Sequence, residues 1–384
     1  MKKLFFILLV LFFFQTIAFG VDYSLFGNIK MSAAYHYFPD LDPINEFSGN
    51  LSFTGNHRIN LNAGDFFVHH RLSLNEQVEF SHDLYEAYLY MMPFDKFGFS
   101  LGKQRVNWGT SYVFSPSDRM HPSSGILDQE TGFPGIALFF PITADINITG
   151  CMGMEDIIEN RKTNFWEDIR YGINSSFLFG KLEIFGSFVY QWDKILLPGT
   201  GISYDLFGFI IAAEAAIEFN NQILYPENQF IWEQKEFGKP FFYLDIAVEK
   251  IFSGDNFSIF LINEYLYRQA GYTDSEAEYF YNVLASESIP ESLSLEDTIA
   301  DNLLRKHYFY FSLGYEYYNL LSFENSILMN LQDASFISSH KLTFIKLDSL
   351  DFYTEAVWSY GNNNTEFGYL PEKLKIETGA VVHF

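Results

Sequence analysis

The sequence predicts an all-β protein: a transmembrane, antiparallel, up-and-down β-barrel of about 16 strands, within a range of roughly 14–18. Three observations support this prediction. The N-terminus has the form of a secretion signal, long runs of residues alternate between apolar and polar, and the last of these runs ends on the aromatic residue Phe384. Hydrophobic residues make up 48% of the chain while its mean hydropathy is close to zero, so apolar and polar residues are finely mixed.

The N-terminal segment carries the features of an export signal. Lys2 and Lys3 precede an unbroken apolar run over residues 4–14. About eleven residues is the length of a signal h-region, whereas a membrane-spanning helix needs about 20. The small residues Ala18 and Gly20 fit cleavage after Gly20, and the alternative is an uncleaved anchor helix. Because no later apolar run is long enough for a spanning helix, a closed barrel is the remaining way to cross a bilayer.

We therefore expect a cleaved signal peptide, residues 1–20, and a single barrel domain, residues 21–384. Removing residues 1–20 takes away two lysines, which leaves 22 basic and 48 acidic residues and a net charge of −26. Such a chain should repel nucleic acid. Cys151 is the only cysteine, so it can form neither an intramolecular disulfide nor a cysteine metal cluster. We expect no metal ion and no cofactor.

The first predicted strand covers residues 21–37. A strand turns successive side chains to opposite faces, so a strict alternation predicts one apolar and one polar face. The apolar residues occupy the odd positions, namely Val21, Tyr23, Leu25, Gly27, Ile29, Met31, Ala33, Tyr35 and Tyr37.

The same alternation returns over residues 181–193, 305–317 and 351–360. These runs are about 10–16 residues long. Strands of soluble proteins average about 5–6 residues, whereas a tilted membrane-spanning strand needs about 9–11. The length of the runs therefore favours a membrane barrel over a soluble β-sandwich.

The predicted connections are of two sizes. Residues 180–181, 62–65 and 253–256 carry short turn signals. In outer-membrane barrels short turns lie at one end and the longer loops face outward at the other. The segment 272–303 contains eight acidic residues and no Lys or Arg, which suggests a partly helical outward loop. The longer polar stretches are residues 108–134, 153–165, 222–239 and 271–304.

The last predicted strand ends the chain on an aromatic residue. An alternating final strand with a terminal Phe is similar to the signal that outer-membrane barrels present to their assembly machinery, so Phe384 is the expected assembly signal. The residues that share its face are Leu374, Ile376, Thr378, Ala380 and Val382.

Several short motifs resemble the porin-like alginate-export superfamily. Residues 86–90 read Glu-Ala-Tyr-Leu-Tyr, residues 101–109 read Leu-Gly-Lys-Gln-Arg-Val-Asn-Trp-Gly, and residues 116–118 read Pro-Ser-Asp. Further pieces lie at residues 263–267, 330–335 and 365–368. The resemblance spans roughly residues 80–384 and implies two adjacent strands followed by a long loop, without naming a solute. The heavy use of Phe, Tyr, Asn, Ile and Lys fits a low-GC genome such as that of a spirochaete.

The phase of the alternation predicts which side chains face inward. If Tyr85, Ala87 and Leu89 face lipid, then Glu86 lines the lumen. Residues 103–107 depart from this pattern, because Lys103, Arg105 and Asn107 occupy the positions that should face lipid. Either a bulge changes the register there, or these residues lie at the membrane edge.

Charged side chains on predicted strands should point inward, because Arg or Lys on the lipid face at mid-membrane costs about 2–4 kcal/mol. Such charges either solvate the wall or form a selective constriction with opposed groups. The 108–134 loop either folds into the lumen and narrows it or stays outside as a surface excursion. The residues expected to line or narrow the pore are Glu86, Arg105, Asp118, Arg119, Asp245, Glu249, Glu264, Arg268 and Glu355.

These features predict a porin-like channel of the outer membrane for passive diffusion of small hydrophilic solutes, with no enzymatic activity. The alternative is a non-conducting structural or surface-interaction barrel, a polysaccharide anchor or an adhesin, that works through its long loops. Deleting residues 272–303 separates the two, because a channel should keep conducting while an adhesin should lose its ligand. The expected partners are outer-membrane lipid, the barrel-assembly machinery and the solute, and no feature of the sequence sets the oligomeric state.

Overall fold

The computed structural model describes most of the chain between residue 23 and the C-terminus. The predicted signal peptide, residues 1–20, lies outside this part. The described ranges are residues 23–38, 46–61, 64–118, 120, 132–154, 169–192, 195–219, 224–226, 232–234, 239–285, 303–318, 320–347, 349–362, 364–370 and 372–384.

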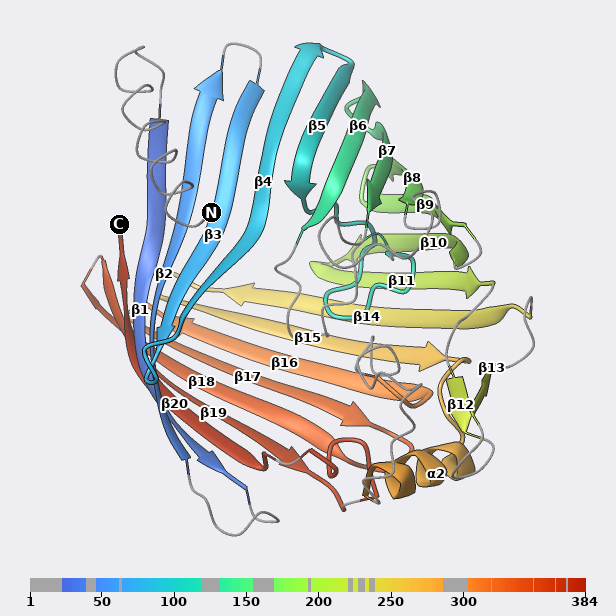
Figure 1. Ribbon diagram of the computed structural model, residues 1–384. Coiled ribbons are helices and arrows are strands. Elements are labelled where there is room, and N and C mark those ends of the chain that lie inside the picture. Colours follow the sequence, from blue (N-terminus) through green and yellow to red (C-terminus); the bar gives the residue numbers. More distant parts are fainter. Residues whose placement is uncertain are drawn as a thin grey trace.

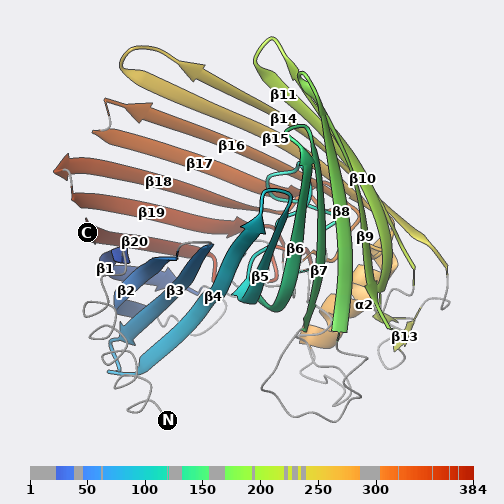
Figure 2. The same ribbon diagram turned by 90° about the horizontal axis from the view of Figure 1, so that it is seen from above.

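The strands form one antiparallel sheet of 18 strands that closes on itself (Figures 1 and 2). Each strand pairs with its neighbours in the sequence, and β1 (Tyr23–Tyr37) also pairs with the last strand, β20 (Leu374–His383). The predicted fold class, an up-and-down β-barrel, is confirmed. The strand number lies at the upper end of the expected range and above the favoured value of 16, because many connections are only two or three residues long.

The remaining barrel strands follow in chain order. They are β2 (Glu46–Leu61), β3 (Gly64–Asn75), β4 (Phe80–Phe94), β5 (Phe97–Gln104), β6 (Phe133–Thr143), β7 (Ile146–Met154), β8 (Ile169–Phe179), β9 (Leu182–Gln191), β10 (Ile195–Leu206), β11 (Phe209–Glu218), β14 (Phe241–Ser253), β15 (Phe257–Arg268), β16 (His307–Tyr317), β17 (Leu321–Asn330), β18 (Phe336–Leu347) and β19 (Leu350–Tyr360).

The outer face of the barrel is apolar, as the alternation predicts. Leu25 and Met31 of β1 are exposed there, and so is Val382 of β20. Phe384 ends this stripe at the seam, where its backbone N–H donates to the Gly27 carbonyl and its carbonyl accepts from the Gly27 N–H, at 3.1 and 3.0 Å. The C-terminal residue therefore extends the pairing of β20 with β1 to the end of the chain.

One end of the barrel carries tight turns. The short connections predicted at residues 180–181 and 253–256 are present, between β8 and β9 and between β14 and β15. Phe207 and Gly208 join β10 to β11 with φ of +54° and +76°. Positive φ at both central residues is the geometry of a type I′ turn, whose twist matches that of the flanking strands.

The other end carries the longer connections. Between β11 and β14 lies a small hairpin of β12 (Leu224–Pro226) and β13 (Trp232–Gln234), and between β15 and β16 lies the helix α2 (Asp274–Ala285) (Figure 1). The helix that the sequence suggested for the acidic loop is thus present. It begins with a capping box, because Thr273 and Glu276 exchange backbone-to-side-chain hydrogen bonds. Among the described residues, no helix is long and apolar enough to cross a membrane.

The structure corrects the expected orientation of Tyr85. The pairing of β3 with β4 shifts its register next to this residue, so that Tyr85 is an extra residue on β4. Its ring is buried on the lumen side, beside His69 and under the guanidinium of Arg71, and not on the lipid face. Its carbonyl accepts a hydrogen bond from Gly132 N at 2.9 Å. A bulge of this kind leaves no trace in the apolar pattern of the strand.

The departure over residues 103–107 also has a structural explanation. Strand β5 ends at Gln104, so Arg105 and Asn107 no longer belong to the wall. Lys103 is the last residue with the outward phase, and its Nζ donates to the Leu84 carbonyl at 2.6 Å.

Candidate functional site

The chain leaves the barrel wall after Gln104, and residues 105–118 lie in the lumen. Figures 1 and 2 show this segment inside the barrel, close to β11 and β14. We call residues 105–118 the inner loop. It lies against the inward faces of β11, β14 and β15, where three buried carboxyl groups hold it.

Glu264, on β15, binds three successive backbone amides at the tip of the inner loop. Its carboxyl oxygens accept from Tyr112 N at 3.2 Å, Val113 N at 3.0 Å and Phe114 N at 2.6 Å. The residue is only 1% exposed. Three successive backbone amides thus converge on one buried carboxyl group, in the geometry of a nest. Glu264 therefore fixes the position of the loop tip.

Glu214, on β11, holds both ends of the loop's turn. It accepts from Ser117 N at 2.7 Å, Thr110 N at 3.2 Å and the Ser115 hydroxyl at 3.3 Å. Gly109 has a φ of +109°, and a Cβ there would lie 2.6 Å from a Glu214 oxygen. The close approach of loop backbone to carboxylate thus requires glycine at this position.

Asp245, on β14, completes the row. Its carboxylate accepts from the Ser111 hydroxyl. Asp245 is directly opposite Glu214 in the pairing of β11 with β14, and β15, which carries Glu264, is the next strand. We call Glu214, Asp245 and Glu264 the anchor carboxylates. All are fully buried beneath the inner loop, so they hold the loop instead of lining open lumen.

The inner loop is also closed on itself and packed on the wall. Asp118 accepts from Trp108 N at 2.9 Å and from Met120 N at 3.3 Å. The side chains of Trp108 and Met120 belong to an apolar cluster with residues of β6, β9 and β10. They lie so close to Gly172 of β8 that a Cβ there would collide with both. Hydrogen bonds within the loop and packing against the barrel wall therefore both fix its position.

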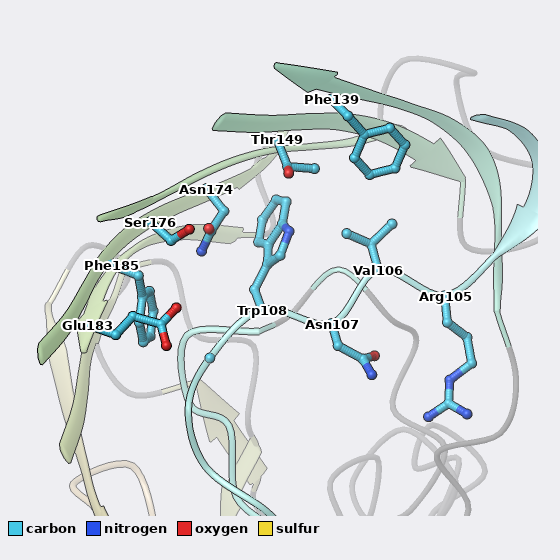
Figure 3. Close-up of a pocket in the computed structure, with 11 residues that line it drawn as sticks. Arg105, Val106, Asn107, Trp108, Phe139, Thr149, Asn174, Ser176, Glu183 and Phe185 are labelled. Carbon is cyan, nitrogen blue, oxygen red and sulfur yellow. The ribbon is translucent and has the colours of Figure 1, made fainter. Parts of the chain in front are cut away.

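Two cavities lie beside the inner loop, and Arg105 and Phe139 line both of them. Arg105 is positioned through its backbone N–H, which donates to Glu86 at 3.1 Å. The first cavity measures about 330 Å³ and is bounded by the loop and the inner faces of β6–β9 (Figure 3). The second measures about 360 Å³ and is bounded by β1–β6, with the ion pair of Arg58 and Asp65, 2.6 Å apart, at its wall.

A second group of charged side chains lies on β1, β19 and β20. Glu377 pairs with Lys30 at 2.7 Å and with Lys375 at 2.9 Å, and the Tyr353 hydroxyl donates to it. The ammonium of Lys30 lies 4.9 Å from the centre of the Tyr353 ring. Ion pairs and a hydrogen bond among these side chains therefore link β1, β19 and β20 on the inner face of the wall.

The structure brings many of the predicted site residues together. Glu86, Arg105, Asp118, Asp245 and Glu264 all contact or belong to the inner loop. Their roles in conduction stay predictions.

The other predicted site residues lie elsewhere. Glu249 is on the inward phase of β14, four residues from Asp245, and Glu355 accepts from the Ser339 hydroxyl at 3.0 Å. Arg268 is buried and donates to the Leu303 carbonyl. Arg119 lies outside the described residues.

Sequence reasoning missed Glu214 as a site residue. The signal was present, because Glu214 and Glu218 interrupt an otherwise apolar run on β11. A lone acid on the inward phase of an apolar strand needs a partner inside the barrel. That the partner is the backbone of a loop about a hundred residues earlier is visible only in the fold.

The architecture defines the class of fold: a closed antiparallel barrel of 18 strands with a loop folded into its lumen. Among solved structures, the fold is similar to OccK5 (OpdH) of Pseudomonas aeruginosa, with 11% identity, a TM-score of 0.57 and coverage of 94% of this chain and 98% of that one. It is also similar to a BenF-like porin from Pseudomonas fluorescens Pf-5, with 11% identity, a TM-score of 0.55 and coverage of 94% and 98%.

A third similar structure is OccK2 (OpdF) of Pseudomonas aeruginosa in complex with glucuronate, with 10% identity, a TM-score of 0.57 and coverage of 94% and 97%. No protein-family model and no curated protein matches the sequence. None of the three structures is an alginate-export protein. The resemblance noted in the sequence is thus supported as far as a porin-like barrel, and no further.

Proposed function

We propose that this protein is an outer-membrane channel for the passive diffusion of small hydrophilic solutes, without catalytic activity. The observation that carries the proposal is the inner loop, which crosses the lumen of a closed barrel and is held there by the anchor carboxylates. A barrel that served only as a scaffold for surface loops would not need a built constriction.

The lining supports passage of polar solutes. An apolar outer face and a charged inner face are the arrangement of a water-filled barrel in a bilayer. Arg105, between the two cavities, and the pair of Arg58 and Asp65 place fixed charges of both signs along the path beside the loop. Opposed charges at a constriction select solutes by charge and orientation.

The similar structures agree with this proposal. One of them is described as a BenF-like porin, and another is a complex with the small hydrophilic molecule glucuronate. A protein of similar fold therefore binds a small hydrophilic molecule.

Two proposals concern delivery to the outer membrane. Residues 1–20 are removed after Gly20 on export, and the C-terminal strand with Phe384 is read by the barrel-assembly machinery. The N-terminal mass of protein purified from outer membranes tests the first. Deletion of Phe384, which removes the last pairing with Gly27, should lower the amount of folded barrel in the membrane.

Planar-bilayer recording tests the channel function. Purified mature protein should insert with discrete, uniform conductance steps. A correctly folded barrel, shown by its β-sheet circular dichroism and its resistance to proteolysis, that gives no steps would refute the proposal.

A further inference from the structure

Aromatic rings follow one another along the two cavities. Phe67 of β3 and Tyr88 of β4 are adjacent, with ring centroids 5.4 Å apart. Tyr90 of β4 meets Phe139 of β6 edge-on at 5.8 Å. Phe139 lines both cavities, and Trp108 of the inner loop continues the series into the first one (Figure 3). We call these five residues the aromatic row.

The charges along the row balance. In the second cavity, Arg58 and Asp65 form an ion pair. Arg105, which lines both cavities, adds one positive charge, and Glu183 of the first cavity adds one negative charge. The other polar side chains of the first cavity are neutral amides and hydroxyls, namely Asn107, Thr149, Asn174 and Ser176. The two cavities together therefore carry no net charge from Lys, Arg, Asp or Glu.

Trp108 supplies an unused donor at this site. Its indole N–H is buried and has no hydrogen-bond acceptor among the described residues. A buried donor without a partner costs about 1–3 kcal/mol. In Figure 3 the indole stands between Val106 on one side and Thr149 and Asn174 on the other, at the wall of the first cavity. Because the indole nitrogen has almost no exposed surface, a hydroxyl group bound there would accept this hydrogen bond after a small shift of the ring toward the cavity.

We propose that the aromatic row and its neutral polar neighbours form a binding site for an uncharged, hydroxylated ring, that is, a mono- or disaccharide. The proposal rests on the channel function proposed above and names the class of its solute. A sugar ring presents C–H faces that pack on aromatic rings and hydroxyls that both donate and accept. Cavities of about 330 and 360 Å³ fall within the usual range for small-molecule sites, about 300–1,000 Å³.

The balance of charge separates this proposal from a site for organic anions. In the first cavity Arg105 and Glu183 lie on opposite sides of the space (Figure 3). A carboxylate bound between them is attracted by Arg105 and repelled by Glu183, whereas a neutral ring meets no such repulsion. Glucose and glucuronate share one ring and differ in a carboxylate, so they are a matched pair of probes.

Binding is measured first by fluorescence, without requiring conduction. Maltose is titrated into mature protein held in a detergent without a sugar headgroup, and the emission of Trp108 is followed, with Trp108→Phe identifying its contribution. Maltose should change this emission in a saturable way. Tyr88→Leu removes a ring of the row and should weaken binding about fivefold to tenfold, whereas Tyr88→Phe keeps the ring and should weaken it about twofold or less.

Phe352→Leu is the control outside the site, because Phe352 lies exposed on the outer face of β19. It should bind maltose as the wild type does. Glucose should bind at least as tightly as glucuronate.

The proposal is overturned if maltose does not change the emission, if Tyr88→Leu binds it as the wild type does, or if glucuronate binds more tightly than glucose. Maltose should also reduce single-channel current in bilayers, and less so in Tyr88→Leu. If the protein conducts but does not bind maltose, the proposed sugar site is refuted and the channel function is not. If the protein binds maltose and the variants bind as expected, but it does not conduct, the channel function is refuted and the sugar site is not.

Discussion

Glu366 is a further buried carboxyl group, and its hydrogen bonds go to segments other than the inner loop. It lies in the connection between β19 and β20, at the end of the barrel that carries the longer loops, and is 7% exposed. It accepts from the Tyr308 hydroxyl at 2.7 Å, Asn330 Nδ2 at 2.7 Å and Leu304 N at 2.9 Å. It therefore ties together three segments that are far apart in the sequence.

The electrostatics of Glu366 make these loops sensitive to pH. Burial, reinforced by the nearby carboxylate of Asp333, raises the pKa of Glu366 to about 7, against the opposing effect of its hydrogen bonds and of Arg268. Because the pKa is raised in the folded state, the associated stability is fully present below the ordinary pKa of 4.5. It is lost as the pH rises through about 7.

We expect the Leu304 amide, which is bonded to Glu366, to exchange with solvent more slowly at pH 5 than at pH 8. The comparison uses hydrogen exchange rates corrected for the intrinsic effect of pH. The difference should be on the order of 2–3 kcal/mol in opening free energy. In Glu366→Gln this pH dependence should disappear, and equal dependence in the variant would contradict the assignment. The Gly254 amide, in a turn at the opposite end, is the internal control.

At the scale of elements, the inner loop owes its place to strands that are remote in sequence. Glu264 and Phe114 are 150 positions apart, yet they are joined by a 2.6 Å hydrogen bond. The loop tip also packs through Phe114 against the apolar cluster of Tyr308 and Leu328. Removing the carboxylate would leave several buried amides without acceptors, each at a cost of about 1–3 kcal/mol.

We expect Glu264→Ala to release the loop tip while leaving the barrel closed. In planar bilayers the variant should show a larger or noisier single-channel current than the wild type, and proteolysis within residues 105–118 should become faster. Combining it with Glu214→Ala should strengthen both effects. The matched control is Glu324→Ala, since Glu324 is an exposed carboxylate on β17, away from the loop. Unchanged current and proteolysis in Glu264→Ala would show that the loop does not depend on this anchor.

The strands themselves follow from local sequence wherever the alternation is regular. The pattern over residues 21–37 predicts β1, and the same reasoning predicts β9, β16, β19 and β20. Successive side chains of a strand point to opposite faces, so residues that alternate in the sequence share one face in the structure. Tyr85 breaks this rule. A bulge inserts one residue on β4 and moves Tyr85 to the lumen side, and its cause lies in the pairing with β3, which no single strand reveals.

At the scale of the whole molecule, the barrel wall has an apolar outer face and a polar inner face. Leu342 lies near the middle of β18 and is 47% exposed on the outer face, while its neighbour Thr343 has the inward phase. An arginine therefore meets lipid at one position and the polar interior at the next.

We expect Leu342→Arg to destabilise the barrel in lipid vesicles by about 2–4 kcal/mol, because a guanidinium at mid-membrane on the lipid face is costly. Thr343→Arg should change the stability by much less. The measurement is reversible denaturant unfolding followed by tryptophan emission. Equal effects of the two substitutions would mean that the two faces do not differ in environment.

The sequence by itself determined the class of fold, the strands with regular alternation, the apolar outer face that ends at Phe384, and the set of inward charges that includes Glu264 and Asp245. These depend on local periodicity and on the cost of placing a charge in lipid. Only the tertiary structure decided the closure into 18 strands, the bulge at Tyr85 and the partners of the anchor carboxylates. Each of these depends on pairing between distant segments, because the curvature of the closed sheet sets which inward side chains meet across the lumen.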